Sequence, residues 1–574
     1  MPKPTQSSST HPSDLEQSLG SARLRVPFIL IFVCASACSL VPIWASRWLP
    51  LGDLGGHIEL FDVVSRYHDT KLAYTQVYAL PTQLGPNTAS LIAAYLLSPL
   101  DALSSAKLLL SAYVLALPLA TLLLCRAFRR SAWLALFSFP LVFNALMNMG
   151  ALNWLLGLPL ILTSFASARL LVEERRWWWA VSLSVTLLLL LLTHVMAFLI
   201  GLGMVLAVLL LFARRWRDLL WLLLLLPSMP LFGRWAWQMF IGLQQNTAGR
   251  SFGTSDGLQA SFRDSATLLM MMHTWGMQFF RDFSDELAFS LLLGNWLLLL
   301  VWSWRRRSRR PTSRQQQWSP AFLGGHASGL LRSDSPPPGS EFLWNVERMR
   351  VLRSLSIAFA RRWALEGSAL CCFLAYLSLP SEINEMEVIN QRIVVIFLLL
   401  LSVSLRLSVK TLRDALLFLP VAALALGYPV VVAWHFQRFE REEVGELPAL
   451  LETLPEGSSM AYVMLDKDSE LTFMGPLWHL PKAIHALSNG GVTDDSFAIR
   501  PYTPVQYREG QAMPRMQPYG EHFLAAQEFG LFDYVLVRSF ELPAHLAHAA
   551  ALEPCGSSGP WHLFRSKRHS TGPD

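Results

Sequence analysis

A short acidic segment near residue 53 holds the residue types best suited to chemistry. Directly after the first long apolar stretch the chain runs Trp48-Leu-Pro-Leu-Gly-Asp53-Leu-Gly-Gly-His57-Ile-Glu59-Leu-Phe-Asp62. Asp53 and His57 are spaced i,i+4, so a helix would place both side chains on one face. A carboxylate at a lipid–water boundary can act as a general base, because desolvation raises its pKa toward a useful value. The segment predicts that Asp53 accepts a proton and that His57 orients it or shares a cation with it.

Structural roles stay open for the same segment. An aspartate beside glycines also suits a helix N-cap or a turn, which is the alternative for Asp53. Asp62 and Arg66 are expected to form a solvated i,i+4 ion pair. Three apolar residues recur at helical spacing and are expected to lie along the membrane surface. They are Ile58, Phe61 and Val64.

The composition places this segment in a membrane protein. The chain has 574 residues, of which 53% are apolar and 15% charged, against roughly 25% charged residues in soluble domains. Apolar runs such as 219–226 favour lipid, which accepts a helix that is apolar all round. The net charge of +6 is interpreted as a topology signal and not as a nucleic-acid footprint. The cysteine pattern indicates neither a disulfide framework nor a metal cluster.

The apolar stretches predict an all-α polytopic membrane domain over 25–434. A span needs about 20 apolar residues, and we predict about eleven spans on that basis. They lie near 25–46, 106–125, 131–148, 151–168, 177–193, 195–213, 219–240, 287–304, 363–380, 392–409 and 414–434. Residues 177–213 are too long for one helix across a core of roughly 30 Å, so we expect a tight turn near His194. The segment 87–103 is expected to be an interfacial or re-entrant helix.

Arginine clusters alternate with the spans and predict the orientation. Lys and Arg beside spans stay on the cytoplasmic side. With residues 1–24 as a cytoplasmic tail, the clusters at 126–130, 169–176, 214–217, 305–310 and 406–413 all fall inside. The first outer loop is then 47–105, and 305–362 is a basic cytoplasmic loop. The excess of Arg over Lys favours a bacterial cytoplasmic membrane.

Residues 435–574 change character and predict a small extracytoplasmic α/β domain. The apolar runs give way to short strand-like pieces at 460–465, 534–537 and 561–564, with helix-like stretches between them. His479 and the pair Gly490-Gly491 could form a binding surface in this domain. The alternative is a surface side chain and a turn.

The layout of the chain resembles the GT-C class of membrane glycosyltransferases, which includes protein O-mannosyltransferases, the lipid A aminoarabinose transferase and oligosaccharyltransferase catalytic subunits. The features that carry the resemblance are an acidic residue in the first outer loop, an interfacial helix leading into the second span, and a C-terminal outside domain. Two motifs also resemble uncharacterised bacterial multi-span proteins. They are Gly52-Asp53…His57 and Phe143-Asn144…Gly150-Ala-Leu-Asn153.

This resemblance implies a polyprenyl-phosphate sugar donor and a loop carboxylate that either deprotonates the acceptor or holds a divalent cation, Mg²⁺ or Mn²⁺. That role falls on Asp53. Many members of the class carry paired acidic residues in this loop, whereas Leu54 and His57 are the near neighbours here. The divalent cation therefore stays an alternative to direct proton removal.

The leaving phosphate would need cationic partners, for which outer arginines are the natural choice. Arg392 stands out because it begins a span after the acidic run 382–387. An ion pair with one of those glutamates, or snorkelling, is the alternative. Asn144, Asn148 and Asn153 flank a short outer turn and could face a sugar-binding cavity or cap helices. The further arginine candidates are Arg234, Arg250, Arg263 and Arg281.

The sequence thus predicts an integral membrane enzyme that moves a sugar from a lipid-linked donor to an extracytoplasmic glycan, lipid or protein. Membrane lipids are expected partners, and nucleic acid is not. A non-catalytic scaffold or a transporter in envelope assembly is the alternative function. A transporter should show internal repeats or charged residues in mid-span, and neither is clear in this sequence.

Overall fold

The computed structural model describes residues 22–567 except 214–215, 247–259, 309–355, 357, 384–385, 495, 501–502 and 512–529. Most of the predicted cytoplasmic tail and of the predicted basic loop therefore lie outside the described residues.

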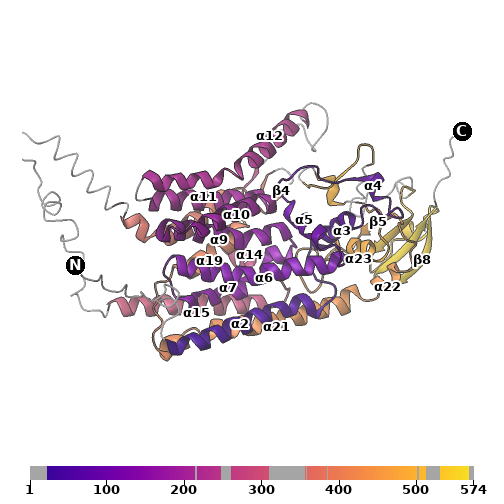
Figure 1. Ribbon diagram of the computed structural model, residues 1–574. Coiled ribbons are helices and arrows are strands. Elements are labelled where there is room, and N and C mark those ends of the chain that lie inside the picture. The colour runs from indigo at the N-terminus through magenta and orange to yellow at the C-terminus, as the bar shows by residue number, and fades with distance from the viewer. Residues whose placement is uncertain are drawn as a thin grey trace, which may run out of the picture.

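The protein is a multi-pass membrane protein whose long helices run side by side (Figure 1). Six helices in the described part are long and apolar enough to cross a membrane: α2 (Ala22–Ala45), α6 (Ala102–Ala127), α9 (Leu152–Glu174), α11 (Val195–Phe212), α15 (Ser284–Ser308) and α21 (Leu419–Phe439). Shorter apolar helices accompany them, among them α10 (Trp177–Thr193), α18 (Ala364–Ser378) and α19 (Ile393–Ser404). The total of eleven spans stays a prediction.

Two predicted spans are interrupted. The stretch 131–148 is divided into a 3₁₀ helix η1 (Ala132–Phe137) and the short helices α7 (Ser138–Val142) and α8 (Ala145–Asn148). The prediction of one continuous span over 219–240 is wrong, because the 3₁₀ helix η2 (Trp216–Leu225) and α12 (Met229–Asn246) meet at a turn. Pro227 and Pro230 lie at this break, and proline removes a backbone donor and disfavours helix in the residue before it.

The predicted turn at His194 is confirmed. α10 ends at Thr193 and α11 begins at Val195, with His194 in an extended conformation between them (φ −161°, ψ 125°). The Nδ1 atom of His194 accepts a hydrogen bond from the backbone N–H of Met196 at 3.2 Å and so caps α11.

The first outer loop contains α3 (Leu54–Ser65), α4 (Tyr74–Val77) and α5 (Ala89–Leu96). At eight residues, α5 is too short to span a membrane, as predicted. The predicted placement of the apolar stripe of α3 on the membrane surface is wrong. Ile58, Phe61 and Val64 are only 2%, 0% and 9% exposed, because α3 packs against α6 on the membrane side and against the C-terminal segment on the other.

The chain after α21 carries a four-stranded sheet of order β5-β7-β9-β8. β5 (Met460–Met464) and β7 (Tyr534–Arg538) are parallel, while β9 (Trp561–Ser566) is antiparallel to β7 and to β8 (Leu552–Ser558). β5, β7 and β9 match the predicted strand-like pieces, and β8 was not predicted. The remaining elements here are the π-helical turn η5 (Glu440–Val444), α22 (Leu447–Leu451), α23 (Leu480–Ser488), η6 (Phe497–Ile499) and α25 (Ala544–Ala547).

The sheet shares a hydrophobic core with the membrane helices. Met460, Tyr462 and Leu536 belong to the same buried cluster as the helix interior, while Val463 and Val535 belong to a second, smaller cluster on the other side of the sheet. The first outer loop joins this part of the chain through strand β1 (Tyr78–Ala79), which pairs with β6 (Gln506–Tyr507).

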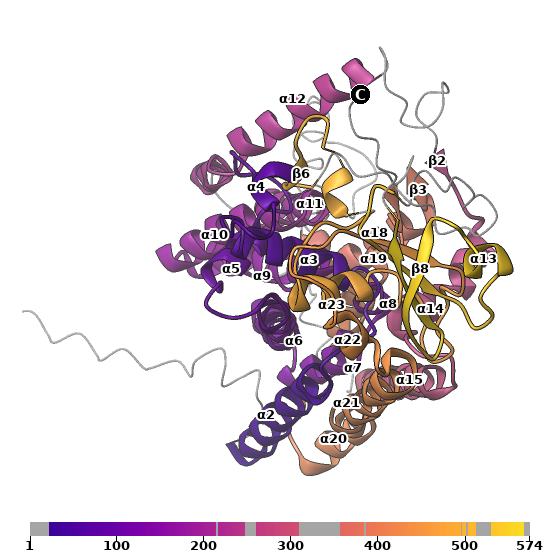
Figure 2. The ribbon, with the colours of Figure 1, turned by 90° about the vertical axis from the view of Figure 1, so that its right-hand side faces the viewer.

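The two ends of the helix bundle differ in character. The sheet, α3 and α23 lie together at one end, which we call the sheet end (Figures 1 and 2). The opposite end, called the basic end, gathers arginines that are far apart in sequence: Arg129, Arg130, Arg169, Arg361, Arg362 and Arg406.

Short elements complete the connections: β2 (Ala260–Ser261), β3 (Glu382–Ile383), β4 (Met386–Glu387), α13 (Ser265–Met270), α14 (Met272–Met277) and α20 (Leu412–Leu416).

Candidate functional site

Backbone contacts fix the position of Asp53 at the sheet end. Its N–H donates to the carbonyl oxygen of Met149 at 2.6 Å, and the N–H of Gly52 donates to that of Asn148 at 2.9 Å. Gly150 has φ +77°, and a Cβ atom there would lie 2.6 Å from the backbone nitrogen of Leu54. The two predicted motifs, around residues 52–57 and 143–153, therefore meet backbone to backbone, and glycine is required at their contact.

The carboxylate of Asp53 is not used to cap the helix that follows it. Asp53 occupies the N-cap position of α3 with φ −79° and ψ −8°, and its side chain makes no capping hydrogen bond. The side chain is 27% exposed, and its Oδ1 atom lies 3.8 Å from Nε2 of His479. The positive end of the α3 dipole favours a negative charge at this position. The arrangement places a partly exposed carboxylate at the start of α3.

Helix α23 reaches Asp53 because α3 begins with glycines. A Cβ atom on Gly55 would clash with the carbonyl oxygen of His479, and one on Gly56 would lie 2.8 Å from the ring of Phe497. His479 is 5% exposed, so the alternative of a surface side chain is wrong. Figure 2, viewed from the sheet end, shows α3 and α23 side by side. Gly490 and Gly491 have φ +68° and +106°. These values fit a turn, which was the alternative to a binding surface for this pair.

His57 contacts aromatic rings. Its partly buried imidazole lies edge to face with Phe497, with ring centres 5.4 Å apart, and Phe497 lies 5.0 Å from the ring of His479. Burial, and then the charge of Arg500, lower the pKa of His57 from 6.5 to about 4. The imidazole is therefore neutral at pH 7. Its contact with Phe497 points to packing, while its predicted role as the partner of the Asp53 carboxylate stays a prediction.

The side chains around Asp53 bear on the alternative of a divalent cation. Within the described part of the chain, no group of three or more His, Cys, Asp or Glu side chains is placed to hold a metal ion. Asp53 and His479 offer one carboxylate and one ring nitrogen, 3.8 Å from each other. Mg²⁺ demands octahedral oxygen coordination, usually with carboxylates and substrate phosphates among its ligands. One carboxylate beside a substrate phosphate is compatible with Mg²⁺, so the divalent cation stays an alternative to direct proton removal by Asp53.

Arg392 lies at the N-terminus of α19, at the junction of three helices. Its Nη1 atom is 2.7 Å from Nε2 of His194, and its guanidinium carbon lies 5.6 Å from the ring centre of Trp154 in α9. The side chain is partly buried. An imidazole and an indole thus contact the guanidinium, and the alternatives of a glutamate pair or snorkelling stay open.

The three candidate asparagines have different roles. Asn144 is fully buried and caps α8, accepting from the N–H groups of Leu146 and Met147 at 3.0 and 3.2 Å. The capping alternative therefore holds for Asn144. Asn148 is also fully buried and donates to the carbonyl oxygen of Phe279 at 3.0 Å, while its Oδ1 atom has no hydrogen-bond partner among the described residues.

Asn153 shares with Asn148 an acceptor atom that has no partner among the described residues. It lies in the first turn of α9, directly before Trp154, and its buried Oδ1 atom has no hydrogen-bond partner among the described residues. The segment from Met149 to Trp154 thus runs from the backbone of Asp53 to the ring beneath Arg392. Asn153 lies on this path and has an unused acceptor.

The other arginine candidates lie in different surroundings. Arg281 is exposed, donates to the carbonyl oxygen of Thr472 at 3.3 Å and lies over the ring of Phe473. Arg263 is exposed and contacts the sulfur of Met271. Arg234 is exposed on α12, and Arg250 lies outside the described residues.

Two further acidic residues of α3 are buried, which sequence reasoning missed. Asp62 is 4% exposed, pairs through both oxygens with Arg66 at 2.7 and 2.6 Å, and accepts from the Tyr74 hydroxyl at 2.7 Å. The predicted i,i+4 ion pair is therefore confirmed, but its aspartate is buried and not solvated. Burial raises the pKa of Asp62, against the opposing effect of Arg66. Glu59 is 1% exposed and accepts from the Thr493 hydroxyl at 2.7 Å.

Comparisons with known proteins relate the chain to two solved structures. No protein-family model and no curated protein matches it. The chain is similar to ArnT from Cupriavidus metallidurans in the apo state, with 15% identity and a TM-score of 0.44 over 96% of this chain and 100% of that chain. It is also similar to the arabinofuranosyltransferase AftD from Mycobacteria, with 14% identity and a TM-score of 0.43 over 96% of this chain and 40% of that chain. Both are similarities of fold alone.

Proposed function

We propose that the protein is a membrane glycosyltransferase that moves a sugar from a polyprenyl-phosphate donor to an extracytoplasmic acceptor, with Asp53 as the general base. The observation that supports this most is the Asp53 carboxylate itself. Backbone hydrogen bonds fix it at the N-terminus of α3, yet it makes no capping bond and remains 27% exposed. A carboxylate that only stabilised the helix would accept from the N–H groups of the first turn.

The reaction is a displacement at the anomeric carbon of the donor sugar. The acceptor hydroxyl oxygen attacks that carbon, and its proton passes to an oxygen of Asp53. The bond from the anomeric carbon to the phosphate oxygen breaks, and its electron pair leaves with the lipid phosphate. Fixed placement of the base lowers the barrier because less reorganisation is needed at the moment of transfer.

The leaving phosphate gains negative charge and needs a cation. Arg392 supplies it in this proposal, because its guanidinium is held between His194 and Trp154 at the sheet end of α19. Asn153, with its unused Oδ1 atom, accepts a hydrogen bond from a sugar hydroxyl.

The substitution Asp53→Asn tests the proposal. It keeps the size of the side chain and removes the base, so the rate of transfer should fall by about 10² to 10⁴-fold while donor binding persists. Transfer from a polyprenyl-phosphate sugar would be followed in detergent, with and without a chelator. Asp101→Asn is the matched control, because Asp101 does cap its helix, through Ser104 N–H at 2.6 Å, and asparagine caps equally well.

Three results would change the assignment. Full activity in Asp53→Asn would remove Asp53 from the mechanism. Failure of the wild-type protein with every lipid-linked sugar tried would favour the alternative of a non-catalytic scaffold or transporter in envelope assembly. Loss of activity on chelation would contradict direct proton removal.

A further inference from the structure

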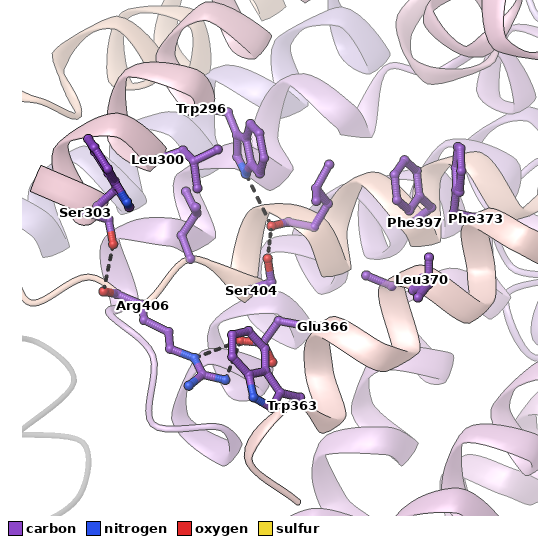
Figure 3. Close-up of a pocket in the computed structure, with 14 residues that line it drawn as sticks. Trp296, Leu300, Ser303, Trp363, Glu366, Leu370, Phe373, Phe397, Ser404 and Arg406 are labelled. Atoms are coloured by element: carbon purple, nitrogen blue, oxygen red, sulfur yellow. Dashed lines mark hydrogen bonds and ion pairs between the residues drawn. The ribbon is translucent and has the colours of Figure 1, made fainter. Parts of the chain in front are cut away.

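Two adjoining cavities lie at the basic end, at the opposite end of the helices from Asp53. The larger has a volume of about 500 Å³ and lies between α15, α18 and α19. Figure 3 shows Trp296, Leu300, Phe373 and Phe397 around it, with Arg406 and Glu366 at one end. The smaller has a volume of about 180 Å³. Arg406 lines both, so the two cavities meet at its side chain.

The smaller cavity is strongly basic. Its lining contains two phenylalanines, one leucine and no acidic residue. The other lining residues are six arginines from segments that follow or belong to different helices: Arg129, Arg130, Arg169, Arg361, Arg362 and Arg406. Bringing six guanidinium groups together costs repulsion unless counter-charges are present.

Carboxylates nearby offset part of this charge. Each of two glutamates pairs with two of the six arginines, at 2.8 Å in three of the four pairs. The pairs are Glu173 with Arg129 and Arg169, and Glu366 with Arg130 and Arg406. The six arginines thus carry more positive charge than these two carboxylates offset. Their guanidinium groups line a space large enough for a phosphate group. Arginine is the side chain best matched to phosphate oxygens.

The larger cavity opens toward lipid. Leu300, Trp304 and Leu370 line it and are 40%, 68% and 55% exposed, on helices whose outer faces are apolar. Its volume is in the range of pockets that enclose small-molecule ligands, roughly 300 to 1,000 Å³. Trp304 and Trp363 line this cavity together with Arg406. Tryptophans are typical of the boundary between hydrocarbon and headgroups.

We propose that these cavities together bind one anionic glycerophospholipid, with its phosphate among the six arginines and an acyl chain in the apolar cavity. Basic pockets between membrane helices on the cytoplasmic side suit such headgroups, and the positive-inside rule expects the basic end on that side. A soluble anion would need only the small cavity. The larger, lipid-facing cavity that meets it at Arg406 is the reason to assign a lipid.

Binding to the full-length protein in detergent tests this proposal. Phosphatidylglycerol should raise the Tm in a saturable way and be retained in native mass spectra, while phosphatidylcholine and inorganic phosphate should do neither. Arg129→Gln with Arg362→Gln should weaken phosphatidylglycerol binding by about fivefold per charge removed. Ala369→Phe, which fills the larger cavity, should weaken phosphatidylglycerol binding.

Arg413→Gln is the matched control, because Arg413 is exposed at the same end and lines neither cavity. The Tm of each variant without lipid shows whether it is folded. Equal binding of phosphatidylcholine, or equal weakening by Arg413→Gln, would overturn the proposal. Equal stabilisation by inorganic phosphate, with no effect of Ala369→Phe, would identify a free-anion site and also overturn it. None of these outcomes depends on sugar transfer at Asp53.

Discussion

Oδ1 of Asp53 and Nε2 of His479 lie 3.8 Å apart, although one residue precedes the second membrane helix and the other follows the last. The contact depends on the close approach of α3 and α23, which the glycines of the first outer loop allow. The candidate site is therefore shared between an N-terminal loop and the C-terminal segment.

Gly55→Ala should separate these two helices. The new Cβ atom would meet the backbone of His479, which cannot move without shifting α23. We expect a loss of about 1 to 3 kcal/mol in the free energy of unfolding, and a fall in transfer activity. Gly203→Ala is the control, because no atom lies within 4 Å of a Cβ there and alanine favours its helix. Equal Tm values for the two variants would contradict the close contact.

Asp62→Asn should destabilise the protein far more than loss of a surface ion pair. The substitution removes the charge that faces Arg66, which is 31% exposed, and losing a hydrogen bond to a charged group costs about 1.5 to 3 kcal/mol. Glu456→Gln removes the exposed pair with Lys71 and should cost at most about 1 kcal/mol. Denaturant unfolding followed by tryptophan fluorescence compares the two variants.

Two buried histidines should make stability fall at acidic pH. Burial lowers the pKa of His57 and of His485 from 6.5 to about 4. Between these values the unfolded chain binds more protons, so the free energy of unfolding falls as the pH decreases, by up to about 1.4 kcal/mol per pH unit for each residue. Asp62 acts in the opposite direction, because its pKa is raised and its protonated form is favoured in the folded state. His485→Gln should reduce the slope between pH 6.5 and 4, and an unchanged slope would contradict the assignment.

Arg392→Ala should raise the KM for the donor more than it lowers kcat. A hydrogen bond to a charged group contributes about 1.5 to 3 kcal/mol, or roughly 10 to 150-fold in affinity. Arg392→Lys should restore only part of this, because lysine lacks the planar group that lies over Trp154. Arg263→Ala, on the exposed Arg263, should behave like the wild type. A KM unchanged in Arg392→Ala would exclude the phosphate contact.

The orientation can be tested with reporter fusions. The arginine clusters gather at the basic end, so we expect this end in the cytoplasm and residues beyond 434 outside. A periplasm-specific reporter fused after residue 434 should be active, and one fused at Ser313 should be inactive. The reverse pattern would invert the topology and place Asp53 on the cytoplasmic side.

Helix positions were largely predictable from the sequence, because long apolar runs leave few alternatives. Whether an apolar stripe on a helix faces lipid or protein could not be predicted. Ile58, Phe61 and Val64 look the same whether they touch lipid or protein, and the structure buries them under α6 and the C-terminal segment. The burial of Asp62 was unpredictable for the same reason. Its partner Tyr74 lies beyond the end of α3, and α23, which covers it, is more than four hundred residues away in the sequence. The break near Pro227 had a signal in the sequence, since two prolines interrupt the predicted span.

The candidate position of Asp53 was predictable, and its surroundings were not. The Gly-Asp motif marked the residue, and the motif ending at Asn153 marked the loop that holds its backbone. The approach of His479 could not be inferred, because nothing in the local pattern of either segment specifies a partner several hundred residues away. Gly55 and Gly56 are the residues that permit this approach. Glycines occur at the start of a helix for many other reasons, so they did not identify α23 as the partner.

The contact between α3 and α23 also sets the order in which the protein is completed during synthesis. The chain is made from its N-terminus, so α3 enters the membrane complex long before α23 exists. Until then the buried acids Glu59 and Asp62 lack Thr493 and the cover of α23. A truncated or stalled chain would carry Asp53 without the neighbour that shields it. The N-terminal loop therefore reaches its final packing only when the C-terminal segment has been made.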